Sequence, residues 1–426
     1  MRRRSFLWAA GAALCSFQRG SAQNPLGTLT WVESDGLWIR ELPHGAPAKI
    51  ASTAGLHTPR FSPTGAWISY LDADENRFVV SRDGRIASPF EAALGLLPPE
   101  DRLPSDAVLS PDGKRYAAVE MHENPPAADG WNEDRAELTV VPIAIPGDKP
   151  RTLIPANEGG IQIYGWTRDG KSILYWRADE WSGSLWSDDV PFYSMPAEGG
   201  PERKLGSVLA HDDVLGLAPK TAGNRLAVTR SVSGRMTWQG QRVAVVDLDT
   251  GAERTLTSDD VAAICPSWSP DGRTIACTSG PDAGLAWQKS MAGRNIKVLN
   301  PDGTVSTQAV TPQTRIDVGG DYARGYLWQR KIWLLDAAGV AAPRQLTNDS
   351  NYRDEEPVWS ADGKFILFGR MDSNSRTSLW LMGADGSGAT QICPLQIRTE
   401  MPRQQDSWFG YYGYLDWRSA FDWRHG

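Results

Sequence analysis

The stretch WSPDGRTIACTS, Trp268–Ser279, decides the fold. Pro270, Asp271 and Gly272 form a turn signature, because Pro fixes φ, Asp can bond its own backbone and Gly accepts a positive φ. Short segments rich in β-branched and aromatic residues flank them, which predicts two antiparallel strands joined by a tight turn. Copies recur as FSPTGAWISYLD from Phe61, LSPDGKRYAAVE from Leu109, WTRDGKSILYWR from Trp166, WSADGKFILFGR from Trp359 and, more weakly, LAPKTAGNRLAVTR from Leu217.

Each copy is followed by two further strand-like runs, so the repeating unit has four strands. Examples of these later runs are RVAVVDLDTGAERTLTS from Arg242 and SLWLMGADGSGATQIC from Ser378. Regular self-similarity on this scale indicates a repeat architecture, and a unit of four antiparallel strands is the blade of a β-propeller. The sequence therefore predicts an all-β chain with a single β-propeller.

The blade count follows from the residue before each turn, which we use as an anchor. The anchors Phe61, Leu109, Trp166, Leu217, Trp268 and Trp359 lie 48, 57, 51, 51 and 91 residues apart. The last gap is nearly double the others. The segment Arg315 to Thr347 loosely fits a further repeat, with Ile316 as its anchor and Gly319-Gly320 in its turn. We therefore favour eight blades; if this segment is an insertion, the propeller has seven.

Each end of the chain resembles part of a blade. TLTWVES, LWIREL and AKIAS, between Thr28 and Ser52, look like second, third and fourth strands, and GYLDWRSAFDW, anchored at Trp417, looks like a first strand. Joining the N- and C-terminal strands would complete one last blade. We expect the C-terminal strand to pair beside Thr28–Glu33 and close the ring, because closure removes exposed sheet edges.

The N-terminus reads as a targeting segment, with a signal peptide over residues 1–22 and the propeller domain over 23–426. Arg2 to Arg4 form a charged region, Phe6 to Phe17 an apolar one, and Gly20 to Ala22 a small-residue cleavage site. RRSFL resembles the twin-arginine signal; an ordinary secretory signal is the alternative. No other apolar run is long enough to span a bilayer, so we expect a periplasmic or secreted protein, most simply a monomer.

Composition and charge fit a turn-rich, acidic domain. The chain has 42 Gly and 29 Pro and a formal charge of −7, and removal of residues 1–22 takes away four arginines and no acid, which brings the charge to −11. An acidic chain without a basic stripe argues against nucleic acid as the partner. No cofactor is predicted.

Cys265 and Cys277 flank the turn at Ser269–Gly272 at nearly equal distances, so they could face each other across the hairpin. The expected compartment would permit a disulfide. Directly paired strand residues rarely give good disulfide geometry, and two small buried thiols are the alternative.

The repeats resemble the WD40-like propeller repeat of the TolB family, whose signature is roughly P-x-[FW]-S-P-D-G followed by an apolar strand. The same repeat occurs in the propellers of dipeptidyl peptidase IV and prolyl oligopeptidase. CPSWSPDG, Cys265 to Gly272, and EEPVWSADG, Glu355 to Gly363, match best. The sequence departs from TolB, which carries an N-terminal α/β domain, and from the peptidases, whose hydrolase domain has a G-x-S-x-G elbow. The resemblance implies a fold more than a function, because one fold hosts many roles.

The long loops between second and third strands of blades two to five carry the main binding signal. Long loops on a rigid scaffold concentrate binding residues, and tryptophan supplies apolar area with a hydrogen-bond donor. We therefore predict a non-enzymatic binding protein that recognises a protein, peptide or glycan on this face. The alternative is that the tryptophans fold back and cap the blades. The candidate ligand-binding residues are Trp131, Trp181, Trp186, Trp238 and Trp287, with Glu123, Asp179 and Glu180 beside them.

A metal-dependent enzyme is the alternative function. Oligogalacturonate lyases are propellers with similar repeats that use a bound metal and a basic residue to abstract a proton. This resemblance makes His57, His122 and His211 the candidate metal ligands, with Arg230 or Lys289 as the base. A metal needs converging ligands, and these histidines belong to blades one, two and four, so we rank this function second.

Overall fold

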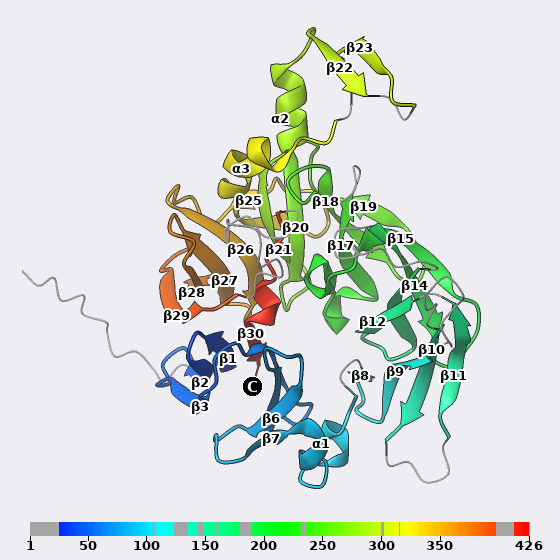
Figure 1. Cartoon of the computed structure of the whole chain (residues 1–426), viewed down its shortest axis with the longest axis vertical. Coiled ribbons are helices and arrows are strands. Elements are labelled where there is room, and N and C mark those ends of the chain that lie inside the picture. Colours follow the sequence, from blue (N-terminus) through cyan, green and yellow to red (C-terminus); the bar gives the residue numbers. More distant parts are fainter. Residues whose placement is uncertain are drawn as a thin grey trace, which may run out of the picture.

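The computed structural model describes residues 25–104, 107–122, 135–143, 149–158, 160–178, 189–231, 236–299, 302–314, 316–397 and 413–425. The described residues form seven four-stranded antiparallel sheets and one separate two-stranded hairpin. The sheets stand around a common centre as the blades of a propeller, and their order round the ring follows the sequence (Figure 1). The predicted single all-β propeller is therefore confirmed.

The first four blades are built from consecutive strands, with the inner strand first. Blade one contains β4 (His57–Phe61), β5 (Trp67–Leu71), β6 (Arg77–Ser81) and β7 (Ala87–Pro89). Blade two contains β8 (Val108–Leu109), β9 (Arg115–His122), β10 (Arg135–Pro142) and β11 (Arg151–Glu158). Blade three contains β12 (Gly160–Trp166), β13 (Ser172–Ala178), β14 (Asp189–Pro196) and β15 (Arg203–Leu209). Blade four contains β16 (Leu215–Leu217), β17 (Arg225–Ser231), β18 (Gln241–Asp247) and β19 (Glu253–Thr255).

The last three blades include an interrupted one and a composite one. Blade five contains β20 (Val261–Trp268), β21 (Thr274–Pro281), β24 (Lys331–Asp336) and β25 (Arg344–Gln345). Blade six contains β26 (Tyr352–Trp359), β27 (Phe365–Asp372), β28 (Thr377–Gly383) and β29 (Thr390–Leu395). Blade seven contains β30 (Phe421–Arg424), β1 (Gly27–Glu33), β2 (Gly36–Leu42) and β3 (Ala48–Ala51).

The Ser-Pro-Asp-Gly phrase forms the turn between the first and second strands of a blade. In blade five, Ser269 Oγ donates to Asp271 Oδ1 at 2.6 Å, and Asp271 Oδ1 also accepts from the backbone N–H of Arg273 at 3.0 Å. Gly272 has φ 70°, a conformation that favours glycine. The phrase thus satisfies the turn internally, which explains why it recurs in blade after blade.

The anchor tryptophans join neighbouring blades. Trp268 Nε1 of blade five donates to Gly216 O of blade four at 2.8 Å, and Trp359 Nε1 of blade six donates to Ser267 O of blade five at 3.1 Å. Each indole therefore bonds the carbonyl one residue before the anchor position of the preceding blade. A buried tryptophan fills the inter-blade space while its N–H is satisfied, which is why this residue suits the position.

The ring is closed by strands from both ends of the chain, as predicted. In blade seven, β30 pairs antiparallel with β1, with Phe421 opposite Trp31. The anchor differs from the prediction, because Trp417 lies in a short 3-10 turn before the strand, where its side chain is buried. Asp422 Oδ2 accepts from the backbone N–H of Phe61 at 2.8 Å and joins the composite blade to blade one.

The favoured count of eight blades is wrong, because the structure has seven. The segment Arg315 to Thr347 supplies β24 and β25, the outer strands of the blade that β20 and β21 begin. Residues 282–330 are an insertion between its second and third strands. The insertion holds α2 (Ala283–Ser290), the hairpin β22 (Asn295–Leu299) and β23 (Val305–Ala309), and α3 (Gly320–Trp328), and the hairpin projects from the ring (Figure 1).

The misassigned repeat contains a helix where the prediction placed a strand turn. Gly319 is the N-cap of α3, and Gly320 is its first residue. Ala323 and Leu327, four residues apart, are the buried residues of α3, as one face of a helix requires. Apart from α2 and α3, the described α-helices comprise the single turn α1 (Phe90–Ala93), and none of the three is long and apolar enough to cross a membrane.

Candidate functional site

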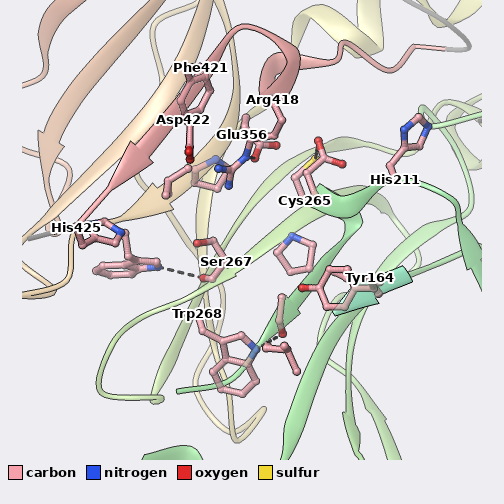
Figure 2. Close-up of a pocket in the computed structure, with 18 of the residues that line it drawn as sticks. Tyr164, His211, Cys265, Ser267, Trp268, Glu356, Arg418, Phe421, Asp422 and His425 are labelled. Carbon is pink, nitrogen blue, oxygen red and sulfur yellow. Dashed lines mark hydrogen bonds and ion pairs between the residues drawn. The ribbon is translucent and has the colours of Figure 1, made fainter. Parts of the chain in front are cut away.

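The inner strands surround a cavity of about 640 Å³ at the centre of the ring. One end of the cavity lies at the turns between first and second strands, since turn residues such as Arg168, Pro270 and Ala361 line it. The remaining lining comes mainly from inner strands and from residues 414–425. Figure 2 shows part of it, with Tyr164, Cys265, Ser267, Trp268, Glu356 and Phe421 among the labelled side chains.

The other end of the central channel is filled by residues 413–419, which precede β30. Gly413 O accepts hydrogen bonds from Arg330 Nη1 at 2.8 Å and from Arg353 Nη2 at 2.9 Å. The same two guanidinium groups contact Glu355 Oε1 at 2.6 and 2.8 Å, and Trp417 Nε1 donates to Glu355 Oε2 at 2.9 Å. We call these buried residues the closed-end network: Arg330, Arg353, Glu355, Gly413 and Trp417.

An acidic cluster lies where the cavity meets residues 413–419, which we call the plug. Asp213 precedes β16, Cys265 lies in β20 and Glu356 lies in β26, so three neighbouring blades contribute. All three are buried, and a ligand atom of each lies within 4.8 Å of those of the other two. Tyr414 Oη donates to Asp213 Oδ2 at 2.7 Å, and Arg418 Nε donates to Glu356 Oε1. We call Asp213, Cys265 and Glu356 the channel cluster.

Two oxygens of the channel cluster lack a donor. Asp213 Oδ1 and Glu356 Oε2 are buried and receive no N–H or hydroxyl donor from the described residues, and the two carboxyl groups hydrogen-bond to each other only when one of them holds a proton. Burial first, and then the Glu356 charge, raise the pKa of Asp213 well above its usual range. Burial, and then Asp213, likewise raise the pKa of the Cys265 thiol. The cluster therefore favours a shared positive charge, either a proton or a cation.

An unusual backbone conformation recurs on the inner strands. Thr58, Cys265 and Glu356 have φ of 52°, 54° and 54°, and each precedes a proline. Register shifts lie at these positions, between His57 and Arg60, Ile264 and Ser267, and Glu355 and Val358. All three residues line the cavity. Non-glycine residues rarely adopt this conformation, and such strain concentrates at functional sites.

The histidines predicted as metal ligands lie in separate surroundings. Their neighbours differ: His57 Nε2 lies 3.7 Å from Glu75 Oε1, His122 Nε2 lies 3.5 Å from Glu137 Oε2, and the His211 ring stacks on the Tyr414 ring with centroids 3.9 Å apart. Among the described residues, the set of candidate ligand atoms that the structure brings together is the channel cluster. His211 lines the same cavity, but His122 does not.

The predicted tryptophan residues are only partly described. Trp238 is buried, and its Nε1 donates to Val318 O at 3.0 Å, which supports the capping alternative for this residue. Trp287 lies in α2 and packs, partly buried, against the same small core. The other candidates lie outside the described residues and stay predictions: Trp131, Trp181, Trp186, Glu123, Asp179 and Glu180.

Cys265 and Cys277 are free thiols in the structure, so the disulfide that their spacing would permit is not formed. The bulge in β20 separates their environments. Cys265 Sγ lies 3.8 Å from Asp213 Oδ2, whereas Cys277 packs in the apolar core of blades four and five. The two buried thiols therefore match the alternative interpretation.

Sequence reasoning missed most of the residues around the channel cluster. The position before the proline of the P-x-[FW]-S-P-D-G phrase is the one that faces the cavity, and Cys265 and Glu356 occupy it in the two best copies. This position was the available signal. No repeat phrase marks the other residues of this region. Asp213 lies outside the phrase, and Tyr414 and Arg418 belong to the plug.

Comparison with known proteins finds homology to TolB over part of the chain. No family model matches the chain. The Tol-Pal system protein TolB of Anaeromyxobacter sp. (strain K) is 29% identical over 183 residues, which are 39% of this chain and 36% of that protein, so the match spans about a third of the relative. The chain is thus homologous to TolB over this stretch, which confirms the resemblance that the repeats predicted.

Several solved structures are similar to this chain, and the first of those named here, at a TM-score of 0.52, supports the propeller fold. A prolyl endopeptidase structure has a TM-score of 0.52 and 12% identity, and the match covers 87% of this chain and 49% of that chain. A putative TolB from Agrobacterium tumefaciens has a TM-score of 0.36 and 19% identity, covering 68% and 80%. An oligogalacturonate lyase in complex with manganese has a TM-score of 0.42 and 12% identity, covering 84% and 83%.

Proposed function

We propose that this chain is an exported propeller that binds a protein or peptide partner at the turn-lined end of its central cavity. The observation that carries the proposal is the cavity itself, which has a volume of about 640 Å³ and a polar and aromatic lining. Its other end is occupied by the closed-end network, so a ligand would enter beside the turns. Concave sites with a few convergent polar groups are the usual places for ligands in a fold of this kind.

Two further observations support a protein partner. The homologous TolB is named a protein of the Tol-Pal system, which associates that relative with other proteins. The predicted signal over residues 1–22 would bring this chain to the periplasm or outside the cell, and both the signal and its twin-arginine type remain part of the proposal. The exposed Arg168 and the half-buried Tyr164 offer a charged and an aromatic contact near the cavity entrance.

The tryptophan-bearing face remains the alternative position for a protein, peptide or glycan. Three of its five candidate tryptophans lie outside the described residues: Trp131, Trp181 and Trp186. The lyase alternative gains no support from geometry. The three histidines have separate neighbours, and Arg230, one candidate base, forms an ion pair with Glu253 at 2.7 Å.

Site-specific photo-crosslinking in the host cell tests the proposal. A photoreactive residue at position 164 should crosslink a partner that gives a discrete adduct. The matched control is position 340, because Val340 is 88% exposed and lies on a turn between third and fourth strands, on the same face but at the outer rim. Adducts from position 181 or 186 with none from 164 would place binding on the other face and overturn the proposal.

A further inference from the structure

The channel cluster has the composition of a metal site. The three ligand atoms lie within 4.8 Å of one another. The Cys265 thiol contacts Asp213 Oδ2, the oxygen that also accepts from Tyr414, so metal binding would replace this thiol contact. Bonds of about 2.0–2.3 Å to one zinc ion require ligand atoms closer together than 4.8 Å, so the cluster would contract on binding. We propose that Asp213, Cys265 and Glu356 bind one divalent transition-metal ion of the zinc or cobalt class, with an open coordination position toward the cavity.

The unpartnered oxygens provide the independent observation. Asp213 is 8% and Glu356 2% exposed, yet Asp213 Oδ1 and Glu356 Oε2 receive no N–H or hydroxyl donor within the described chain. Buried carboxylate oxygens are normally satisfied, so each unsatisfied one calls for an explanation such as an ion. One ion between the two carboxylates would satisfy both oxygens.

The charges also balance around such an ion. Two carboxylates and one thiolate bring three negative charges to a divalent ion, which leaves one net negative charge. The Arg418 guanidinium, which donates to Glu356 Oε1, neutralises it. Without an ion, two buried carboxyl groups lie beside one guanidinium that donates only to Glu356, so ionisation of both is costly, and either a shared proton or an ion relieves it.

The surroundings hold the ligands as the outer shell of a metal site does. Tyr414 Oη donates to Asp213 Oδ2, and Arg418 donates to Glu356, so each carboxylate keeps one oxygen anchored and one free. Hydrogen bonds of this kind orient ligands and tune affinity. Cys265 and Glu356 lie on rigid inner strands of adjacent blades, which fixes their spacing.

The ligand types select the ion. Thiolate favours zinc and similar transition metals, whereas calcium and magnesium prefer sites made only of oxygen. All three residues line the cavity, so an ion and a fourth ligand have a route to the site. Three protein ligands with an open position are the arrangement in which zinc binds a further group from solvent or a partner.

Cobalt titration tests the proposal on purified, tag-free, full-chain protein that has been reduced and freed of metal by a chelator. We expect one cobalt ion per chain, an absorption band from thiolate-to-cobalt charge transfer, and displacement of cobalt by zinc but not by an equal concentration of calcium. Cys265→Ser should abolish the band and raise the dissociation constant at least about tenfold. Cys277→Ser is the matched control, since Cys277 is also a buried free thiol but lies outside the cluster, and it should change neither quantity.

Several results would overturn the proposal. One is a wild-type protein that binds neither cobalt nor zinc, which would leave a carboxyl pair sharing a proton. The proposal would also be overturned if Cys265→Ser kept the charge-transfer band or the cobalt affinity of the wild type. Displacement of cobalt by an equal concentration of calcium would overturn it as well. If Cys265→Ser does not fold, Glu356→Gln decides: it keeps the thiol, so the band should persist while the affinity falls, and an unchanged affinity would contradict the assignment.

Discussion

Neighbouring carboxylates at the two ends of the central channel have different sets of hydrogen-bond partners. At the plugged end, Glu355 accepts from Arg330, Arg353 and Trp417. At the cavity end, the side chain of the next residue, Glu356, accepts from Arg418, and within the described part of the chain its other, buried oxygen receives no N–H or hydroxyl donor. Consecutive residues of one strand therefore differ: Glu355 is a buried charge with cationic and indole partners, and Glu356 is a residue that we propose binds an ion.

The difference follows from the chain segments that reach each end. The plug brings backbone and indole groups of residues 413–417 to Glu355, and Arg330 comes from the end of the blade-five insertion. Glu356 instead faces the space that the inner strands enclose, beside Asp213. The network around Glu355 holds the plug through Gly413 and Trp417, whereas the channel cluster contacts the plug through Tyr414 and Arg418 and also lines the cavity.

Truncation before residue 413 should have the largest effect on the closed end. It removes the plug and β30, which exposes the edge of β1 and takes from Arg330, Arg353 and Glu355 the partners that Gly413 and Trp417 supply. We expect loss of cooperative thermal unfolding, measured by circular dichroism. Replacing the projecting hairpin 295–309 by a short Gly-Ser link is the control and should leave Tm nearly unchanged. An unchanged Tm in the truncated protein would contradict the role of the plug.

Gly369→Ala should have an intermediate effect on the same end. An added Cβ would lie 2.4 Å from Cε3 of Trp417, whose ring is fully buried. We expect a loss of about 1–3 kcal/mol of unfolding free energy from overpacking, measured by denaturant titration. Gly95→Ala is the matched control, because a Cβ at Gly95 would meet nothing within 4 Å. Equal stability of both variants would mean that the Trp417 ring is not held against Gly369.

Tyr414→Phe should have the smallest effect, because it acts at the cavity end. It removes the hydroxyl that donates to Asp213 but retains the ring stacked on His211. We expect a loss of about 1 kcal/mol, the usual worth of one hydrogen bond, in chelator-treated protein. A loss as large as that of a closed-end variant would show that the cavity end is also structural.

The repeat phrase predicted the propeller blades, and the incomplete strand sets at the two ends of the chain predicted the closure of the ring. The residues of the phrase act locally: Trp268 bonds to the adjacent blade, Ser269 and Asp271 bond within the turn, and Gly272 adopts its positive φ. Such local interactions can be predicted from the sequence. The blade count was not predictable in this way. An insertion that begins beyond Pro281 separates strands that pair across about fifty residues, and its helix α3 presents Gly319-Gly320 where a strand turn was expected.

The site was less predictable than the fold. The sequence cannot tell a loop tryptophan that binds a partner from one that packs in a core, and Trp238 is buried with its Nε1 donating to Val318 O. The channel cluster draws residues from three blades that are distant in sequence, so only the three-dimensional arrangement brings Asp213 beside Glu356. Its weak sequence signal, the position before the repeated proline, has meaning only once the strand bulge is known.

The pH dependence of Glu355→Gln follows from the same account. Burial opposes ionisation of Glu355, but Arg353 and then Arg330 outweigh it and hold its pKa below the usual range. A lowered folded-state pKa contributes stability above the unfolded pKa, and this stability is lost as the pH falls through the folded-state value. The stability difference between wild type and Glu355→Gln should therefore be full at neutral pH and shrink in acid, as Tm measured across pH would show.

The most direct test compares Glu355→Gln with Glu356→Gln in chelator-treated protein at neutral pH. Glu355→Gln leaves two buried guanidinium groups without a countercharge, so we predict a loss of about 3–5 kcal/mol in the free energy of unfolding. Glu356→Gln removes a like charge beside Asp213 while it loosens Arg418, so we predict a change within about 1 kcal/mol. Similar losses in the two variants would contradict the claim that one end of the channel is structural and the other is open to a ligand.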